Sequence, residues 1–288
     1  MKKEEYTFID LFAGIGGFHY GLKNAGAKCV FASEIDKDAR KTYEANFLKD
    51  GEFSPLNFAG DITKISPQNI PDHDILCAGF PCQPFSQAGK KFGFNDTRGT
   101  LFFNVASIIK EKRPAAFFLE NVRGILNHDN GKTFNVIQNT LLELGYTFHY
   151  KLIKASDFNL PQHRPRIYMV GFRSDIKDTF EFPPCQPLTK TMSWVFDGQE
   201  CNKKIGFTLR VGGRGSKIDD RRNWEFYIVN NKITRIGIKE AKRMQGYPDS
   251  FVFPVSETQA MKQLGNSVAV TAIEAVANNI IDVLKKSK

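Results

Sequence analysis

The first fifty residues alternate between short apolar runs and helical patterns, and this alternation constrains the fold more than any other feature of the chain. An apolar run at residues 8–12 predicts a strand, and the glycine-rich turn after it leads into a predicted helix over residues 18–25. A second predicted strand at 29–32 and a helix over 38–46 follow. Together they form a βαβ unit, in which a helix connects two parallel strands.

The alternation continues over most of the chain. Later strands are predicted at residues 75–78, 115–119, 148–153 and 167–172, with helices between them at 101–110 and 133–144, and two further helices at 239–244 and 268–284. The sequence therefore predicts an α/β fold built on a doubly wound, mostly parallel sheet.

Between Phe172 and Ile236 the periodic pattern is lost. This stretch has prolines at positions 183, 184 and 187, and its run at 208–216 has too many glycines for a helix. Basic residues gather in and after that run, a pattern that also fits a solvated loop. The sequence predicts a distinct, irregular second module here.

Composition limits the class of protein. The chain of 288 residues is long enough for one large domain or one domain with a smaller module. No apolar run approaches the roughly 18 residues that span a bilayer, and the charged residues 2–5 lead into a strand instead of a signal sequence. We therefore expect a cytoplasmic protein without a membrane partner. Its net charge of +9 suits a polyanionic partner.

The cysteines do not form a recognisable framework. Their number is odd and no Cys-x-x-Cys pair occurs, which argues against disulfides and against a structural zinc site, so we predict no metal. The five are Cys29, Cys77, Cys82, Cys185 and Cys201. A free reactive thiol remains an option.

Cys82 is the candidate nucleophile. It lies between Pro81 and Pro84, directly after the apolar run at 74–78, so we expect it on a stiff loop at the carboxyl end of a strand. Ligands of open α/β sheets bind at that edge. The alternative is a buried and inert cysteine, the commoner fate of this residue type.

The first turn and two acidic residues suggest a nucleoside site. Gly14, Gly16 and Gly17 allow close approach of a ligand to the backbone, although their spacing departs from Gly-x-Gly-x-x-Gly. Glu34 ends the second strand, where a carboxylate would bind ribose hydroxyls, and Asp61 could meet an adenine amino group. This layout fits an adenosine cofactor without a diphosphate, such as S-adenosylmethionine.

Charged residues near two later strands are expected beside Cys82. Glu120 lies just past the strand at 115–119, and Arg164 and Arg166 precede the strand at 167–172. At the same sheet edge they would act on a bound substrate, and Arg164 would help to ionise the thiol. The alternative is a surface cluster of ion pairs.

Six runs in this order closely resemble the motifs of the DNA (cytosine-5) methyltransferase family, in particular its compact bacterial type II restriction-modification members. They are Phe8-Ile9-Asp10-Leu11-Phe12-Ala13-Gly14-Ile15-Gly16-Gly17-Phe18, Gly79-Phe80-Pro81-Cys82-Gln83, Glu120-Asn121-Val122, Gln162-His163-Arg164-Pro165-Arg166, Arg243-Met244-Gln245-Gly246-Tyr247-Pro248 and Gln263-Leu264-Gly265-Asn266-Ser267-Val268.

The resemblance implies a reaction. Cys82 would attack C6 of a cytosine flipped out of double-stranded DNA, and C5 would then take a methyl group from S-adenosylmethionine, leaving S-adenosylhomocysteine. Glu120 would hold the N3 and N4 edge, while Arg164 and Arg166 would steady O2 and the adjacent backbone. The implied cofactor-binding residues are Phe12, Gly14, Gly16, Gly17, Glu34, Ile35, Asp61, Pro81, Leu101 and Asn266. Ile35 replaces a tryptophan that the family often has.

The resemblance also implies a domain organisation. Residues 1–190 and 264–288 would form a Rossmann-like catalytic and cofactor-binding domain, 191–237 a small, irregular, β-rich target-recognition domain, and 238–263 a hinge segment. The implied DNA-binding residues are Ser86, Gln162, Thr208, Arg210, Arg214 and Arg221, and the loop at 87–98 is expected to close over DNA. We expect a monomer with no obligatory protein partner, and a cognate restriction endonuclease in the same organism.

Three alternatives stay open at this point. A nicotinamide-dependent oxidoreductase would share the opening βαβ unit, but it would not need the loop around Cys82. A DNA-binding module without activity would not need Cys82 or Glu120. A tRNA cytosine-5 methyltransferase of the same family is the stronger alternative, because substrate choice depends on the recognition region.

Overall fold

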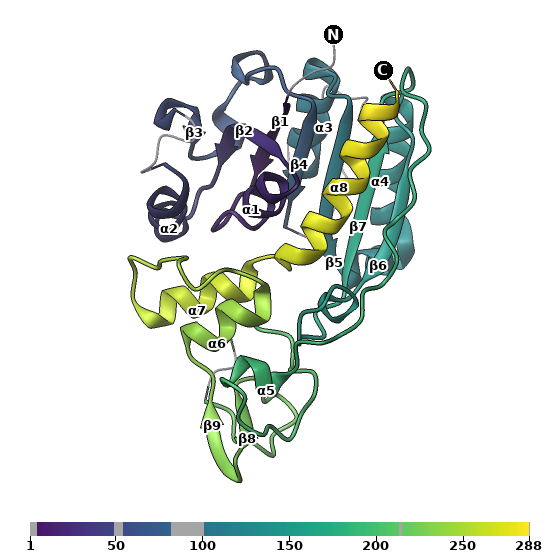
Figure 1. The fold of residues 1–288 in the computed structure, drawn as a ribbon. Coiled ribbons are helices and arrows are strands. Elements are labelled where there is room, and N and C mark those ends of the chain that lie inside the picture. The colour runs from purple at the N-terminus through teal and green to yellow at the C-terminus, as the bar shows by residue number, and fades with distance from the viewer. Residues whose placement is uncertain (1–4, 49–53, 82–100, 213–214, 288) are drawn as a thin grey trace.

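The computed structural model describes residues 5–48, 54–81, 101–212 and 215–287. Its centre is a seven-stranded sheet of order β3-β2-β1-β4-β5-β7-β6 (Figure 1). The strands are β1 (Tyr6–Leu11), β2 (Ala27–Ser33), β3 (Phe58–Ala59), β4 (Ile75–Gly79), β5 (Ala116–Val122), β6 (His149–Ile153) and β7 (Arg166–Phe172). Strands β1 to β5 are parallel, and β7 is antiparallel to both of its neighbours. The predicted doubly wound, mostly parallel sheet is confirmed.

Helices cover both faces of the sheet. Helices α1 (Gly17–Asn24), α2 (Lys37–Phe47) and α8 (Val270–Lys286) contribute to one apolar core, and α3 (Leu101–Lys112) and α4 (Lys132–Glu143) to the other. Successive side chains of a strand point to opposite faces, so the neighbours Phe117 and Phe118 on β5 belong to different cores. The apolar runs of the sequence are therefore strands that are buried on both sides.

Close packing of α1 against α8 depends on glycine. A Cβ atom on Gly21 would come within 2.6 Å of the Ile273 side chain on α8. The segment Glu257–Lys286 has the length and apolarity of a membrane span, but 61% of its most apolar window is buried inside the protein. Because α8 packs on α1 in the core, its apolar side chains already have partners.

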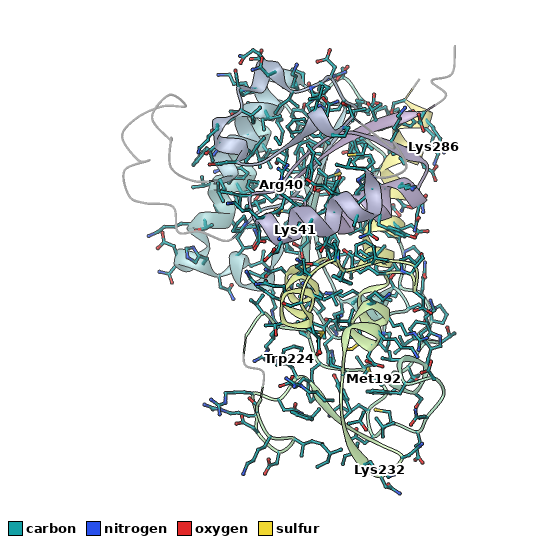
Figure 2. The ribbon with its side chains drawn as sticks, turned by 90° about the vertical axis from the view of Figure 1, so that its left-hand side faces the viewer. Arg40, Lys41, Met192, Trp224, Lys232 and Lys286 are labelled. Carbon is teal, nitrogen blue, oxygen red and sulfur yellow. The ribbon has the colours of Figure 1, made fainter. Side chains whose placement is uncertain are left out.

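A smaller part lies beyond the carboxyl edge of the sheet (Figure 1). It contains α5 (Met192–Val195), α6 (Ile238–Gln245), α7 (Glu257–Asn266) and a hairpin of β8 (Phe226–Val229) and β9 (Lys232–Arg235). Figure 2 shows Trp224 and Met192 inside this part and Lys232 near its far end. Trp224, Tyr227 and Met244 belong to the same apolar cluster as α1 and α8, so one core continues into it.

The structure corrects the predicted position of one site residue and adds elements. Glu120 lies within β5 and not past it, because antiparallel pairing with β7 extends that strand to Val122. Helix α7 had no predicted counterpart, and the β8–β9 hairpin lies within residues 191–237, which were expected to be β-rich without individual strands being predicted. The hairpin turn uses Asn230 and Asn231, both with positive φ, as such tight turns require.

Candidate active site

A cavity of about 490 Å³ opens at the carboxyl edge of the sheet. Residues at or just after the carboxyl ends of β1 to β5 line it, together with residues from the last turns of α7 and Ser267 after them. Of the predicted cofactor-binding residues, those in its wall are Phe12, Gly14, Glu34, Ile35, Asp61, Pro81, Leu101 and Asn266. The structure thus brings together residues that are up to 254 positions apart, from Phe12 to Asn266.

The Glu34 carboxylate is fixed in the wall of the cavity by backbone amides. Its Oε2 accepts from the amide of Gly14 at 2.7 Å, and its Oε1 accepts from the amide of Asp36 at 2.7 Å. Burial raises the pKa of Glu34, although these hydrogen bonds oppose the shift. Arg40 lies over the Phe58 ring at 4.3 Å and donates to the Glu34 carbonyl, so it braces the same corner.

Asp61 and Ile35 lie at the outer rim of the cavity. The Asp61 Oδ1 accepts from the hydroxyl and the amide of Thr63, and the hydroxyl bond is the main reason that its pKa is lowered. Both bonds end on Oδ1, which leaves Oδ2 for a ligand. The Ile35 side chain is 68% exposed beside the cavity, a position from which an apolar group can cover a bound ring.

Gly16 and Gly17, also predicted to bind the cofactor, are not among the residues that line the cavity. Gly16 has φ +84° and precedes α1, and a Cβ atom there would overlap the ring of Phe47. A Cβ atom on Gly17 would come within 2.5 Å of Val268. Both positions need glycine because α1 packs tightly against its neighbours, a packing role like that of the third glycine in Gly-x-Gly-x-x-Gly.

Glu120 and Arg166 form a buried ion pair in the cavity wall. The Arg166 Nε is 3.0 Å from the Glu120 Oε1, and Glu120 is only 7% exposed. Burial raises the pKa of Glu120, with the charges of Arg166 and Arg164 opposing the shift. Asn121 ties this strand to its neighbour by donating to the carbonyl of Phe80 at 2.8 Å. A carboxyl group of raised pKa in a cavity is suited to exchanging a proton with a ligand.

Arg164 differs from Arg166 in its contacts. The structure places the Arg164 guanidinium against the backbone carbonyls of Leu209, Gly265 and Ser267. Its Nε is buried and has no partner in the described structure, so the predicted contact with the cytosine O2 stays a prediction.

Gln162, which was predicted to contact DNA, is fully buried in this structure and has its partners inside the protein. Its side-chain amide donates to the Met244 carbonyl at 2.9 Å and accepts from the Leu209 amide at 3.0 Å. These bonds satisfy a polar side chain inside the protein and hold three segments together.

The other predicted DNA-binding residues fall into two groups. Arg210 and Arg221 are exposed, and the Thr208 hydroxyl accepts from the Arg164 amide at 3.0 Å. Ser86 and Arg214 lie outside the described residues, as do Cys82 and the loop at 87–98. Pro81, the residue before Cys82 in the sequence, lines the cavity.

Sequence reasoning missed two polar residues of the cavity wall. The Ser33 Oγ and the Gln263 Nε2 are buried and have no hydrogen-bond partner within the described part of the chain. Such groups are costly unless a ligand or water satisfies them. Gln263 begins one of the recognised motifs, and Ser33 is the residue before Glu34. Their closeness to predicted site residues in the sequence could therefore have identified them as part of the site. With Glu34 and Asp61, they form a donor and acceptor set that fits an adenosyl group.

Two adjacent residues brace the glycine-rich run of the smaller part. The Trp224 Nε1 donates to the Gly212 carbonyl at 3.1 Å, and the fully buried Glu225 carboxylate accepts from the Gly215 amide. Glu225 also pairs with Arg235 on β9 at 2.7 Å. The position of this run is thus fixed by polar side chains of its own region.

The described residues offer neither a metal site nor a disulfide. No group of three or more His, Cys, Asp or Glu side chains there could hold a metal ion, and four cysteines, Cys29, Cys77, Cys185 and Cys201, are free thiols.

Comparison with known proteins gives a consistent result. Residues 6–210 and 189–282 match the family model described as C-5 cytosine-specific DNA methylase. The type II methyltransferase M1.ScrFI of Lactococcus lactis subsp. cremoris is 47% identical, with 100% of this chain and 81% of that protein covered. The type II methyltransferase M.HhaI of Haemophilus parahaemolyticus is 41% identical, with 97% and 96% covered. The family predicted from the motifs is confirmed.

Solved structures agree on the fold. A methyltransferase structure described as S. pombe Dnmt2 superimposes with a TM-score of 0.73 at 17% identity, over 97% of this chain and 99% of that one. A structure of Spodoptera frugiperda DNMT2 gives a TM-score of 0.71 at 20% identity, over 97% and 99%. At these identities the likeness shows the architecture alone.

Proposed function

The chain belongs to the C-5 cytosine-specific DNA methylase family and is a DNA (cytosine-5-)-methyltransferase, and we propose that it methylates one cytosine in a specific double-stranded DNA sequence with S-adenosylmethionine as donor. The observation that carries the proposal is one cavity in which Glu34 and Asp61 lie at one part of the wall and the Glu120–Arg166 pair at another. The first pair suits an adenosyl group and the second a pyrimidine edge.

The cofactor fits the residues that are present. Glu34 would hold the ribose hydroxyls, Asp61 the adenine amino group, and Ser33 and Gln263 would gain the hydrogen bonds that they lack in the described structure. When bound, S-adenosylmethionine supplies an electrophilic methyl group and leaves as S-adenosylhomocysteine.

The protein's own groups would activate the cytosine. The Cys82 thiolate adds to C6, which makes C5 nucleophilic, so that C5 accepts the methyl group. The C5 proton then passes to a base or water, and the thiolate leaves as the C5–C6 double bond forms again. Glu120, with its raised pKa, holds the N3 and N4 edge and gives a proton to N3, and Arg166 keeps this carboxyl group in place. The target base must be flipped out because C6 is inaccessible inside the stack.

Sequence recognition is assigned to a separate region. We place the catalytic and cofactor-binding domain in residues 1–190 and 264–288, the recognition region in residues 191–237, and a hinge in residues 238–263. Arg210 is the candidate reader of a guanine edge, because it is exposed and follows directly on Leu209, which the buried Gln162 holds. The proposal includes action as a cytoplasmic monomer that protects DNA from a cognate restriction endonuclease.

Bisulfite sequencing of plasmid DNA from cells that express the protein tests this function. We expect conversion-resistant cytosines at one position of one short sequence, and none in cells that express Cys82→Ser. A duplex with 5-fluorocytosine at that position should form a covalent adduct with the wild type, because the C5 proton that must leave is replaced by fluorine. Methylation of tRNA without methylation of DNA would overturn the proposed substrate, and full activity of Cys82→Ser the mechanism.

A further inference from the structure

The Arg164 side chain connects two segments that belong to different parts of the proposed machinery. Its Nη1 donates to the Leu209 carbonyl at 3.3 Å, and its Nη2 donates to the Gly265 carbonyl at 3.0 Å and to the Ser267 carbonyl. Its backbone amide donates to the Thr208 hydroxyl. The residue is 2% exposed, so water does not compete for these bonds. The two terminal nitrogens are therefore occupied by backbone carbonyls on both sides.

The two segments also touch each other directly. Residues 208–210, here called the recognition segment, lead to the exposed Arg210, whereas residues 265–267, the wall segment, line the cavity. A Cβ atom on Gly265 would come within 2.6 Å of the Arg210 carbonyl carbon. The absence of a side chain at Gly265 thus lets the recognition segment lie against the cavity wall, and any shift of one segment displaces the other.

The conformation of Arg164 is an uncommon one. Its φ of +27° is rare for a residue with a side chain, and burial lowers the pKa of its guanidinium to about 9, at which it still carries a charge at neutral pH. Such local cost persists where the surroundings require that conformation, often at functional sites. Arg164 is also one of the residues that line the cavity, while its Nε is buried without a partner in the described structure.

We propose that Arg164 is a positioning residue that couples DNA recognition to cofactor binding, so that the correct DNA sequence on the recognition segment tightens the cavity around the cofactor. This proposal rests on the proposed function. By linkage, the cofactor must raise the affinity for the correct DNA by the same factor. A conservative Arg164→Lys retains the charge but cannot reproduce the planar fork that spans three carbonyls.

The experiment is a calorimetric titration of S-adenosylhomocysteine into three samples. They are the protein alone, the protein with a duplex that contains its target sequence (the correct duplex), and the protein with a duplex in which one base pair of that sequence is changed (the altered duplex). For the wild type we expect the Kd with the correct duplex to be lower than with the altered duplex by at least about fivefold, the lower end of typical couplings. In Arg164→Lys this ratio should fall towards one. Arg243→Lys is the matched control, since Arg243 donates to the Val195 carbonyl away from the cavity, and it should keep the wild-type ratio.

The ratio separates coupling from a general structural role. If Arg164→Lys weakens binding equally with both duplexes, the ratio is unchanged and the proposal is wrong. A wild-type ratio of one also overturns it. Thr208→Val gives a second variant, because it removes the acceptor of the Arg164 amide and leaves the guanidinium in place, and it should lower the ratio as well. A wild type that methylates DNA but shows no coupling refutes this proposal alone, whereas one that neither binds S-adenosylhomocysteine nor methylates DNA refutes the proposed function.

Discussion

The sheet and the glycine-rich run of the recognition region are stabilised by different interactions. In the sheet, apolar side chains from both faces pack against helices, and the charged groups of the cavity wall, such as Glu120, lie at its carboxyl edge. In the recognition region, the glycine-rich run is held by bonds from Trp224 and Glu225 to its backbone. Substitutions in the sheet should therefore change rate or stability, whereas substitutions in the recognition region should change the choice of DNA sequence.

The largest effect is expected at the catalytic edge of the sheet. Glu120→Gln removes the proton that Glu120 would give to N3, so we expect single-turnover methylation to slow by about 100-fold to 10,000-fold. Discrimination between DNA sequences, measured by binding, should stay unchanged. Glu143→Gln, an exposed substitution on α4, is the control. A loss of less than tenfold in Glu120→Gln would contradict the role of this carboxyl group.

Changes at the amino edge of the sheet, opposite the cavity, should affect the stability of the protein alone. His73 precedes β4 and is 8% exposed. Its Nδ1 donates a hydrogen bond to the Pro71 carbonyl at 2.8 Å, while its Nε2 has no partner in the described structure. Burial lowers its pKa from 6.5 to about 4; nearby Lys112 acts in the same direction, and Asp74 and Asp72 act against it.

The sign of the His73 effect follows from linkage. Because the folded pKa is lower than the unfolded one, the stability that His73 contributes is complete above pH 6.5 and is lost as the pH falls towards 4. By pH 5 the loss is about 2 kcal/mol. Urea unfolding at pH 7.5 and pH 5 should show this difference in the wild type and a smaller one in His73→Asn. The exposed His163→Asn should keep the wild-type difference.

The next largest effect is expected from a change in the packing of α1 against α8, and it should appear in the free energy of unfolding. Gly21→Ala places a methyl group against Ile273 on α8, and we expect a loss of about 1 to 2 kcal/mol in the free energy of unfolding, after the gain in helix propensity is subtracted. Gly124→Ala, where no atom lies within 4 Å of the added group, should change it by less than about 0.5 kcal/mol. Neither variant should alter the methylated sequence. A change in the preferred DNA sequence of Gly21→Ala would contradict the expectation that substitutions in the sheet leave sequence choice unchanged.

The recognition region should show the reverse behaviour. Trp224→Phe removes the donor to the Gly212 carbonyl and keeps most of the buried ring, so the glycine-rich run loses one restraint. We expect discrimination against single-base changes to fall by about fivefold, near 1 kcal/mol, the value of one hydrogen bond. Competition between the correct and altered duplexes measures it. Trp194→Phe, 38% exposed on α5, should leave discrimination unchanged.

The same contrast explains what the sequence could predict. Runs such as residues 75–78 and 167–172 are apolar because both faces of the strand are buried, and the alternation of such runs with helical patterns predicted the sheet. The reversed direction of β7 was not predictable, since a strand buried on both faces reads alike in either direction. That reversal is what brings Arg166, at the start of β7, to the same edge as Glu120 near the end of β5.

The polar contacts of the site were the less predictable part. Motif order identified Glu120, Arg164 and Gln162 as important, but not which of them faces a ligand. Gln162 is buried and Arg164 contacts backbone carbonyls. Their partners Leu209 and Gly265 lie 47 and 101 residues away in the sequence, so these contacts could not be predicted. Contacts of this kind depend on the tertiary fold, and no local pattern records them.

The smallest effect is expected at the rim of the cavity. Ile35 is 68% exposed beside the proposed adenine position, and an aromatic ring there would gain stacking that an aliphatic side chain lacks. We expect Ile35→Trp to lower the Kd of S-adenosylhomocysteine by about threefold to tenfold, which corresponds to the roughly 0.5 to 1.5 kcal/mol of an aromatic pair. Ile233→Trp, 64% exposed on the distal hairpin, is the matched control and should leave this Kd unchanged. An equal gain in affinity for S-adenosylhomocysteine in both variants would mean that the added ring does not stack on the adenine in the cavity. The adenine would then have to bind elsewhere.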